Sequence, residues 1–197
     1  MTPFRKIDAV ALALPWANID TDQIVPARYI QKPRSANFAD FLFRDLRSDA
    51  QGMLRPDFPL NVQANANAKI IVAGANFGCG SSREHAVWAL FDHGIRAVVA
   101  PSFGDIFEAN ALKNGLLPIR QKPSVVDRLQ QQLRDQPGAA MTVDLSLQTL
   151  LGPDGQAYPF SIQTFARHCL LEGIDEIDYT LSQIATVEAF ERTLACN

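Results

Sequence analysis

The sequence predicts an α/β fold with a mostly parallel central sheet, and its middle third carries the prediction. Residues 69–73 and 95–100 are runs of Ile, Val and Ala typical of buried strands, and residues 83–92 between them have a helical pattern. A strand, a helix and a strand in this order form a βαβ unit. A predicted helix over 105–114 and a strand over 116–120 repeat the alternation, so these strands are expected to be parallel.

The region before this unit divides into a strand and a long loop. Residues Phe4–Leu14 form an apolar run closed by Pro15, which favours a buried strand. Residues Val25–Leu60 combine prolines with aromatic side chains, which predicts a structured loop with short helices. Since loops that close over a site have low local stability, this loop is expected to be mobile in the isolated chain.

Two helix ends carry local signals. His93 falls in the last turn before Gly94, where a cation is favoured by the helix dipole, so His93 is expected to cap the helix rather than bind a ligand. Ser124, with Asp127 three residues later, predicts an N-cap for a helix over 125–136.

The last third mixes strands and helices. Residues 141–147 alternate, and a turn around 152–155 leads to a second strand over 157–162, which together predict a hairpin. Helical patterns follow over 164–172 and 181–194. Neither an internal repeat nor a low-complexity tract is present, so residues 1–197 are expected to form one domain.

Composition excludes several functions. The 18 basic and 21 acidic residues give a net charge of -3, which argues against nucleic acid as a partner. Cys79, Cys169 and Cys196 are too scattered for a disulfide framework or a self-contained metal or iron–sulphur site. Because no long apolar run is present either, we expect a cytoplasmic protein with no membrane partner.

The turn Gly74–His85 joins the first strand of the βαβ unit to its helix, at the sheet edge where open α/β folds bind ligands. Its glycines, Gly78 and Gly80 among them, allow close backbone approach, the helix start offers free N–H groups, and Arg83 matches a carboxylate or phosphate. The turn therefore predicts an anion site.

Nucleotide and hydrolase motifs do not fit this turn. The dinucleotide pattern GxGxxG places Arg83 where its third glycine should be, and neither a Walker A lysine nor GxSxG is present. Cys79 at the helix start, with His85 as partner, is an alternative nucleophile, although a lone cysteine is more often structural. The plainest alternative is a loop whose two serines, Ser81 and Ser82, only cap the helix.

The sequence resembles the aconitase superfamily, in particular the small subunits of bacterial 3-isopropylmalate dehydratases. The segment Asn76–Leu90 matches the pattern NFGCGSSREHAxWAL, and Asn18–Ile30 is similar to NxDTDxIxPxxxL. Shorter matches lie at 100–107, 114–118 and 165–169, so the resemblance spans nearly the whole chain. It implies a swivelling, three-layer β/β/α domain of the aconitase C-terminal type.

The resemblance also implies an enzyme split over two chains. A large subunit would hold a 4Fe-4S cluster, while this chain alone would bind no cofactor and no metal. The pair would isomerise 2-isopropylmalate, a hydroxy-dicarboxylic acid, to 3-isopropylmalate by dehydration and rehydration, a step of leucine biosynthesis. The open alternatives are a related hydro-lyase acting on homoaconitate, citraconate or dimethylmaleate, and a non-catalytic binding module of the same fold.

Site roles follow from the same resemblance. Ser81 would be the catalytic base, and Arg83, Ser82 and Arg28 would bind substrate. Asp22, Gly78 and Gly80 would support the site by orienting side chains and by supplying backbone N–H donors to a Ser81 alkoxide. Arg28 lies in the stretch that distinguishes substrates in this superfamily, where an apolar side favours an isopropyl group and a cation favours a third carboxylate. Cys79 is assigned no catalytic task.

Overall fold

The computed structural model describes residues 1–35 and 37–195. Within them, a sheet of seven strands has the order β4-β3-β2-β1-β5-β6-β7. The strands are β1 (Lys6–Leu14), β2 (Ile70–Ala73), β3 (Ala97–Ala100), β4 (Leu117–Arg120), β5 (Ala140–Asp144), β6 (Thr149–Leu151) and β7 (Ala157–Pro159). The four strands from β4 to β1 are parallel, as expected, and β5, β6 and β7 extend the sheet in antiparallel fashion.

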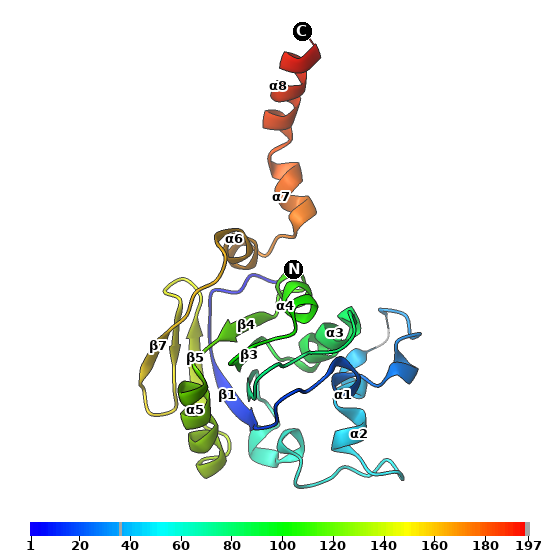
Figure 1. The fold of residues 1–197 in the computed structure, drawn as a ribbon, viewed down its shortest axis with the longest axis vertical. Coiled ribbons are helices and arrows are strands. Elements are labelled where there is room, and N and C mark those ends of the chain that lie inside the picture. Colours follow the sequence, from blue (N-terminus) through cyan, green and yellow to red (C-terminus); the bar gives the residue numbers. More distant parts are fainter. Residues whose placement is uncertain (36, 196–197) are drawn as a thin grey trace.

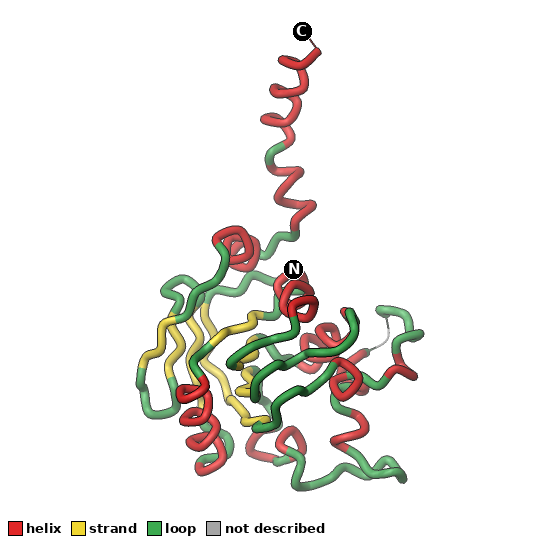
Figure 2. The backbone as a smooth tube through the Cα atoms, in the orientation of Figure 1, coloured by secondary structure: helices red, strands yellow, loops and turns green. Residues whose placement is uncertain are grey.

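Helices cover both faces of the parallel part of the sheet. On one face lie α1 (Thr21–Ile24), α2 (Arg44–Arg47), α3 (Glu84–His93) and α4 (Asp105–Lys113), and on the other lies α5 (Pro123–Asp135), which contacts β1, β2 and β3. Figure 2 shows the strands between these helical layers. The architecture has three layers around this sheet, and it confirms the α/β class with a mostly parallel central sheet that the sequence predicts.

The alternation of side chains along the strands divides the core in two. Leu12 and Leu14 of β1 belong to the cluster beneath α3 and α4, whereas Ala11 and Ala13 belong to the cluster beneath α5. Because successive side chains of a strand point to opposite faces, a strand buried on both faces must be apolar throughout. This is why β2 and β3 appear in the sequence as unbroken apolar runs, and all their residues are buried.

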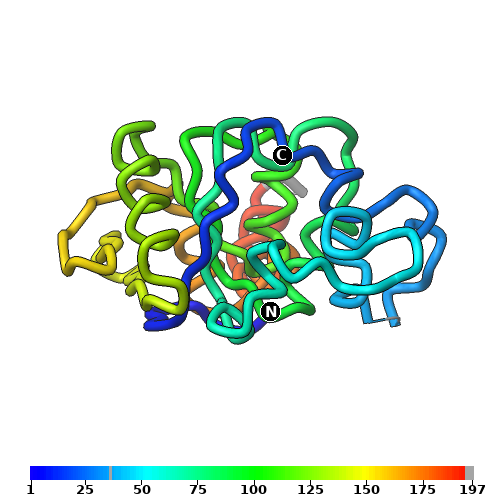
Figure 3. Tube along the Cα trace, turned by 90° about the horizontal axis from the view of Figure 1, so that it is seen from below, coloured from blue at the N-terminus to red at the C-terminus, as the bar shows by residue number. Residues whose placement is uncertain are grey.

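The antiparallel end differs from the predicted hairpin. The turn at 152–155 does join two paired strands, but the partner of β7 is β6, a strand that the sequence pattern does not predict, and β5 pairs with β1 and β6. The three-residue strand β6 is too short to show a periodicity. Figure 3 shows this meander at one end of the molecule and the segment 20–60 at the other.

The predicted N-cap of α5 is wrong, whereas the predicted position of His93 at the end of α3 is confirmed. Helix α5 begins at Pro123, so Ser124 lies inside its first turn, and Lys122 occupies the N-cap position without a side-chain cap. Proline is favoured at the first helical position because its missing N–H has no partner there in any case. His93 does end α3 before Gly94, but its burial, followed by the nearby charge of Arg47, lowers the pKa of the imidazole, which disfavours the expected cation.

The segment Val25–Leu60 contains the predicted short helices, with one-turn 3-10 helices at Ala27–Tyr29, Phe38–Phe41 and Pro59–Asn61 besides α2. Several of its aromatic and aliphatic side chains enter the core beside α3, and the buried ones are Val25, Phe38, Leu42, Phe43, Phe58 and Leu60. The buried residues anchor the segment at several points. Its mobility in the isolated chain stays a prediction.

The C-terminal helices leave the body of the molecule. Helix α6 (Thr164–Glu172) ends at Gly173 as predicted, whereas the helix predicted over 181–194 is divided at Gln183 into α7 (Glu176–Ser182) and α8 (Ile184–Ala195). Figure 1 shows α7 and α8 projecting beyond the sheet. Exposed apolar side chains lie along them, namely Ile177, Leu181, Ile184, Val187 and Phe190. No helix among the described residues has the length and apolar character needed to cross a membrane.

Candidate active site

The predicted site turn lies at the carboxyl end of β2 and is paired with a second segment. Backbone N–H groups of Asn18, Gly78 and Thr21 donate to the carbonyl oxygens of Ala75, Ile19 and Cys79 at 2.8, 2.7 and 2.9 Å, respectively. The segment 18–22, which precedes and begins α1, therefore runs along the turn 75–79. The two segments that resemble the aconitase superfamily most strongly are thus in direct contact.

Gly78 and Gly80 give the turn its shape. Both have positive φ, +72° at Gly78 and +93° at Gly80, a region that residues with a Cβ rarely adopt. At Gly78 space is restricted as well, since a Cβ would lie 2.2 Å from Cγ of Phe107. The alternating glycines turn the chain sharply, so that Ser81 follows on the exposed side of the turn.

The Ser81 side chain faces solvent at the end of the turn and contacts Thr21. The Thr21 hydroxyl donates to the Ser81 carbonyl oxygen at 3.2 Å and lies 3.3 Å from Oγ of Ser81. Thr21 is buried, with 2% of its surface exposed, whereas Ser81 is exposed. The predicted base is therefore accessible, while its neighbouring hydroxyl is fixed inside the fold.

Arg83 and Asp22 meet across the two segments. Nη1 of Arg83 lies 2.5 Å from Oδ1 of Asp22, and the same carboxylate oxygen accepts the backbone N–H of Ala27 at 2.8 Å. The Arg83 N–H is not directed at that oxygen, so the buried Nη1 has a charged neighbour but no aligned acceptor. Contact with Arg83 is the largest influence on Asp22 and lowers the pKa of its carboxyl, and the Ala27 N–H lowers it further.

The start of α3 is not closed by the serines. Arg83 occupies the N-cap position, and no side chain caps the helix there. The alternative in which Ser81 and Ser82 serve only as helix caps is therefore wrong. An uncapped helix start presents N–H groups and a partial positive charge, which suit an anion. Ser82 is exposed next to this helix start.

Arg28 has a partner of its own. Its guanidinium forms a bidentate ion pair with Asp45, which raises the pKa of Arg28 and lowers that of Asp45, and it lies 4.7 Å from the centre of the Tyr29 ring. Among the described contacts none joins Arg28 to Ser81 or Arg83. Substrate binding by Arg28 stays a prediction, with its charge neutralised in this structure.

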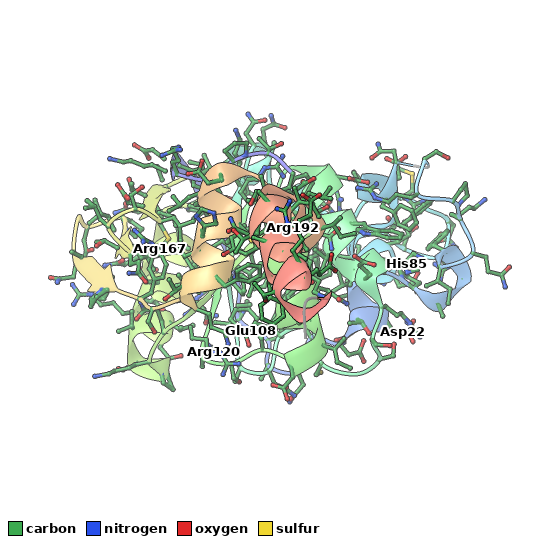
Figure 4. All side chains as sticks on the ribbon, turned by 90° about the horizontal axis from the view of Figure 1, so that it is seen from above. Asp22, His85, Glu108, Arg120, Arg167 and Arg192 are labelled. Atoms are coloured by element: carbon green, nitrogen blue, oxygen red, sulfur yellow. The ribbon has the colours of Figure 1, made fainter. Side chains whose placement is uncertain are left out.

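The surroundings of Cys79 and His85 disfavour the alternative in which this pair supplies a nucleophile. Burial, and then the charge of Asp20, raise the pKa of the Cys79 thiol, which disfavours a reactive thiolate. His85 packs against Trp88 and Phe38, with ring centres 4.5 and 5.5 Å apart, and burial lowers the pKa of its imidazole. Figure 4 shows His85 and Asp22 on the same side of the molecule, opposite Arg167.

A hollow of about 180 Å³ adjoins Ser81. It is lined by the turn and by the start of α4, that is by Gly78, Cys79, Gly80, Ser81, Gly104, Asp105, Ile106 and Phe107. A larger cavity of about 350 Å³ lies between α4, α6 and α7, and no predicted site residue lines it. The smaller hollow is therefore the candidate ligand space, although it is open on one side to solvent.

The described residues do not hold a metal site. No group of three or more His, Cys, Asp or Glu side chains within residues 1–35 and 37–195 is placed to bind a metal ion. Cys79 and Cys169 are free thiols on different elements, and Cys196 lies outside the described residues. An iron–sulphur cluster does not fit the described part of this chain.

Comparisons with known proteins agree with this geometry. The family described as the aconitase C-terminal domain matches residues 1–124, and the family described as LeuD_N matches residues 127–164. The 3-isopropylmalate dehydratase small subunit of Cereibacter sphaeroides is 48% identical over 99% of this chain and 97% of its own length. That of Chloroflexus aggregans is 47% identical over 97% of this chain and 94% of its own length.

The chain belongs to the 3-isopropylmalate dehydratase small-subunit family. A crystal structure of 3-isopropylmalate dehydratase from Methanocaldococcus jannaschii is similar to it, with a TM-score of 0.64 and 27% identity over 94% of this chain and 99% of that one. The aconitase-type fold expected from the sequence is thereby confirmed. Within this small-subunit family fold, the site turn occupies the sheet edge where α/β proteins bind ligands.

The structure adds Thr21 and Gly104 to the predicted site. Gly104 lies against the turn, and a Cβ there would be 2.6 Å from the carbonyl oxygen of Gly78. Both residues fall inside segments whose resemblance to the aconitase superfamily is evident from the sequence. Their contacts with the turn depend on how distant segments pack, so sequence alone carried no signal that singled them out.

Proposed function

We propose that this chain is the small subunit of a 3-isopropylmalate dehydratase, a hydro-lyase, and that it supplies the base of the reaction to an active site shared with a large subunit. Family membership over the full length supports the reaction. The observation that supports the role of this chain is the exposed Ser81 hydroxyl beside Arg83 at an uncapped helix start.

The reaction moves a hydroxyl group between neighbouring carbons of 2-isopropylmalate. Ser81 would take a proton from the carbon beside a carboxylate, the hydroxyl would leave the adjacent carbon, and a double bond would form between them. Water would then add across the double bond the other way round. The hydroxyl would join the carbon that lost the proton, and Ser81 would return the proton to the carbon that lost the hydroxyl, which gives 3-isopropylmalate. General acid–base catalysis of this kind typically contributes about 10²–10⁴-fold to a rate.

The residues of this chain would bind and orient the dicarboxylate. Arg83 would hold one substrate carboxylate through its guanidinium, of which Asp22 occupies only one edge, and Ser82 would line the same space. The free N–H groups at the start of α3 would favour both the substrate anion and a Ser81 alkoxide. Gly78 and Gly80 would keep this backbone in the required shape.

The remaining component would come from the large subunit. A 4Fe-4S cluster on that subunit would supply the Lewis acid that accepts the departing hydroxyl. The absence of a cluster-binding group among the described residues of this chain is compatible with that division of labour. We further propose that residues 1–197 act as one swivelling domain in the cytoplasm, with neither nucleic acid nor a membrane as a partner.

Arg28 bears on the choice of substrate. Because its pairing with Asp45 neutralises the charge, the Arg28 side chain would not attract a third carboxylate, which favours a substrate with an isopropyl group over a tricarboxylic acid. Asp45→Asn would release Arg28. This variant should gain relative activity toward homoaconitate, and unchanged discrimination would contradict the assignment.

The decisive experiment replaces Ser81 in the reconstituted two-subunit enzyme. Ser81→Ala should bind the large subunit normally and lose about 10²–10⁴-fold in kcat. Ser82→Ala is the matched control, since it removes the neighbouring hydroxyl without removing the base, and its loss should be smaller. If Ser81→Ala retained near-normal turnover on 2-isopropylmalate, the proposed role of Ser81 would be refuted.

A further inference from the structure

The buried hydroxyl of Thr21 lies within hydrogen-bond distance of the Ser81 hydroxyl. Their oxygens lie 3.3 Å apart, and either can be the donor. Thr21 has 2% of its surface exposed, so bulk water does not compete for its hydroxyl. The free N–H groups at the start of α3 would favour a Ser81 alkoxide, but they do not determine the direction of the Ser81 O–H before the reaction.

The position of Thr21 is fixed from both sides. Its backbone N–H donates to the carbonyl oxygen of Cys79 at 2.9 Å, within the turn itself. On its other side, a capping box begins α1, in which the Asp20 carboxylate accepts the Gln23 N–H at 2.7 Å and the Gln23 side chain accepts the Asp20 N–H at 2.9 Å. Thr21 is therefore held before any substrate arrives.

The single proton of the Thr21 hydroxyl has two possible acceptors on Ser81. In one arrangement it is donated to the Ser81 carbonyl oxygen at 3.2 Å, and Oγ of Thr21 accepts the Ser81 hydroxyl. In the other, the hydroxyl rotates about its C–O bond and donates to Oγ of Ser81. A threonine hydroxyl carries one donor and two acceptor lone pairs, so both arrangements satisfy its chemistry.

When the Thr21 hydroxyl rotates away, the Ser81 carbonyl oxygen keeps another hydrogen-bond donor. This oxygen also accepts the backbone N–H of Arg83 at 2.8 Å, which is the shorter of its two hydrogen bonds. Withdrawal of the Thr21 proton therefore does not leave an unsatisfied carbonyl. A hydrogen bond to an ionised oxygen is also roughly twice as strong as one between neutral groups. The second arrangement is consequently favoured once Ser81 loses its proton.

We infer that Thr21 is a positioning residue for Ser81. Before the reaction the Thr21 hydroxyl accepts a hydrogen bond from the Ser81 hydroxyl, and during the reaction it donates one to the Ser81 alkoxide. The inference rests on the proposed role of Ser81. No atom is exchanged between the two residues, because the Thr21 hydroxyl only rotates and redirects its donated hydrogen bond from the Ser81 carbonyl oxygen to Oγ of Ser81. Thr21 would thereby aim Oγ of Ser81 at the hollow and make it easier to ionise.

The test uses the enzyme reconstituted with its large subunit and three variants of Thr21. Thr21→Val keeps the shape and removes the hydroxyl, and it should lower kcat by about 10- to 100-fold, as expected for one hydrogen bond to a charged group. KM should change little, because Thr21 is buried and does not line the hollow beside Ser81. Thr21→Ser restores the hydroxyl without the methyl group and should recover most of the activity.

The pH profile separates this role from a structural one. Loss of the donor raises the pKa of Ser81, so the limb of kcat that rises with pH should move to higher pH in Thr21→Val, and not in Thr21→Ser. Thr21→Ala should show the same displacement, which keeps the test valid if valine disturbs folding. Normal kcat in Thr21→Val, no displacement, or failure of Thr21→Ser to recover activity would each overturn the inference. An active Ser81→Ala would instead refute the proposed base.

Discussion

Replacement of Gly78 by alanine should be strongly destabilising, for two reasons that can be separated. A residue with a Cβ at φ +72° costs roughly 1–2 kcal/mol relative to a favoured conformation. The Cβ would also lie 2.2 Å from Cγ of Phe107, and no flexible side-chain end is available to yield. Phe107 has 3% of its surface exposed and packs on Phe77 at 5.3 Å between ring centres.

The steric part adds a similar amount. Forcing extra atoms into a packed core typically costs about 1–3 kcal/mol, so Gly78→Ala should lose about 2–5 kcal/mol of unfolding free energy in total. Gly80→Ala is the matched control, since its φ is +93° but its nearest neighbour, Cβ of Asp20, lies 3.5 Å from the new Cβ, an ordinary contact. It should lose only the backbone part, roughly 1–2 kcal/mol.

Urea unfolding of both variants measures the difference directly. The difference between the two losses reports the contact with Phe107, and it should shrink when Phe107→Leu is combined with Gly78→Ala, because two residues in contact do not contribute additively. If Gly80→Ala proved as costly as Gly78→Ala, the steric argument would be wrong, and the turn would be limited by its backbone conformation alone.

Three further predictions concern regions outside the turn. Arg34→Ala removes the bidentate ion pair with Asp92, whose two N–O distances are 2.7 and 2.8 Å. Because the backbone N–H of Phe38 also donates to Asp92, hydrogen exchange of the Phe38 amide should accelerate, while the global free energy of unfolding falls by no more than about 1 kcal/mol. Unchanged exchange at Phe38 would contradict this prediction. Burial holds the pKa of His93 below its usual range, so the unfolded state binds more protons as the pH falls below about 6.5, and stability should decrease on acidification through the folded-state pKa. His93→Gln should flatten that decrease, measured by urea unfolding between pH 7 and 5, and an unchanged slope would count against it. Deletion of residues 183–197, whose described apolar side chains are largely exposed on α8, should change the unfolding free energy by less than about 1 kcal/mol, and a larger loss would mean that α8 stabilises the body.

Local patterns were sufficient for most of the parallel half of the fold. β2 and β3 are buried on both faces and so appear as continuous apolar runs, and glycines end α3 and α6 where they were expected. Local patterns gave a wrong prediction where two helix-start signals lie side by side, and they gave none where a strand is very short. Pro123 began α5 in place of the Ser124 cap, and the short β6 left too few residues to show a period.

The sequence by itself determined which residues could carry the chemistry, because the glycines, the serines and Arg83 of the turn Gly74–His85 lie within a few positions of one another. The tertiary structure alone decided how they are supported. Pairing of segment 18–22 with the turn brings Thr21 to Ser81 and Asp22 to Arg83 across about sixty residues of chain. Such contacts arise from packing between distant segments, and packing leaves no periodic signal in either segment. The same physical reason explains why the neutralisation of Arg28 by Asp45 and the partial burial of His93 became evident only in the folded chain.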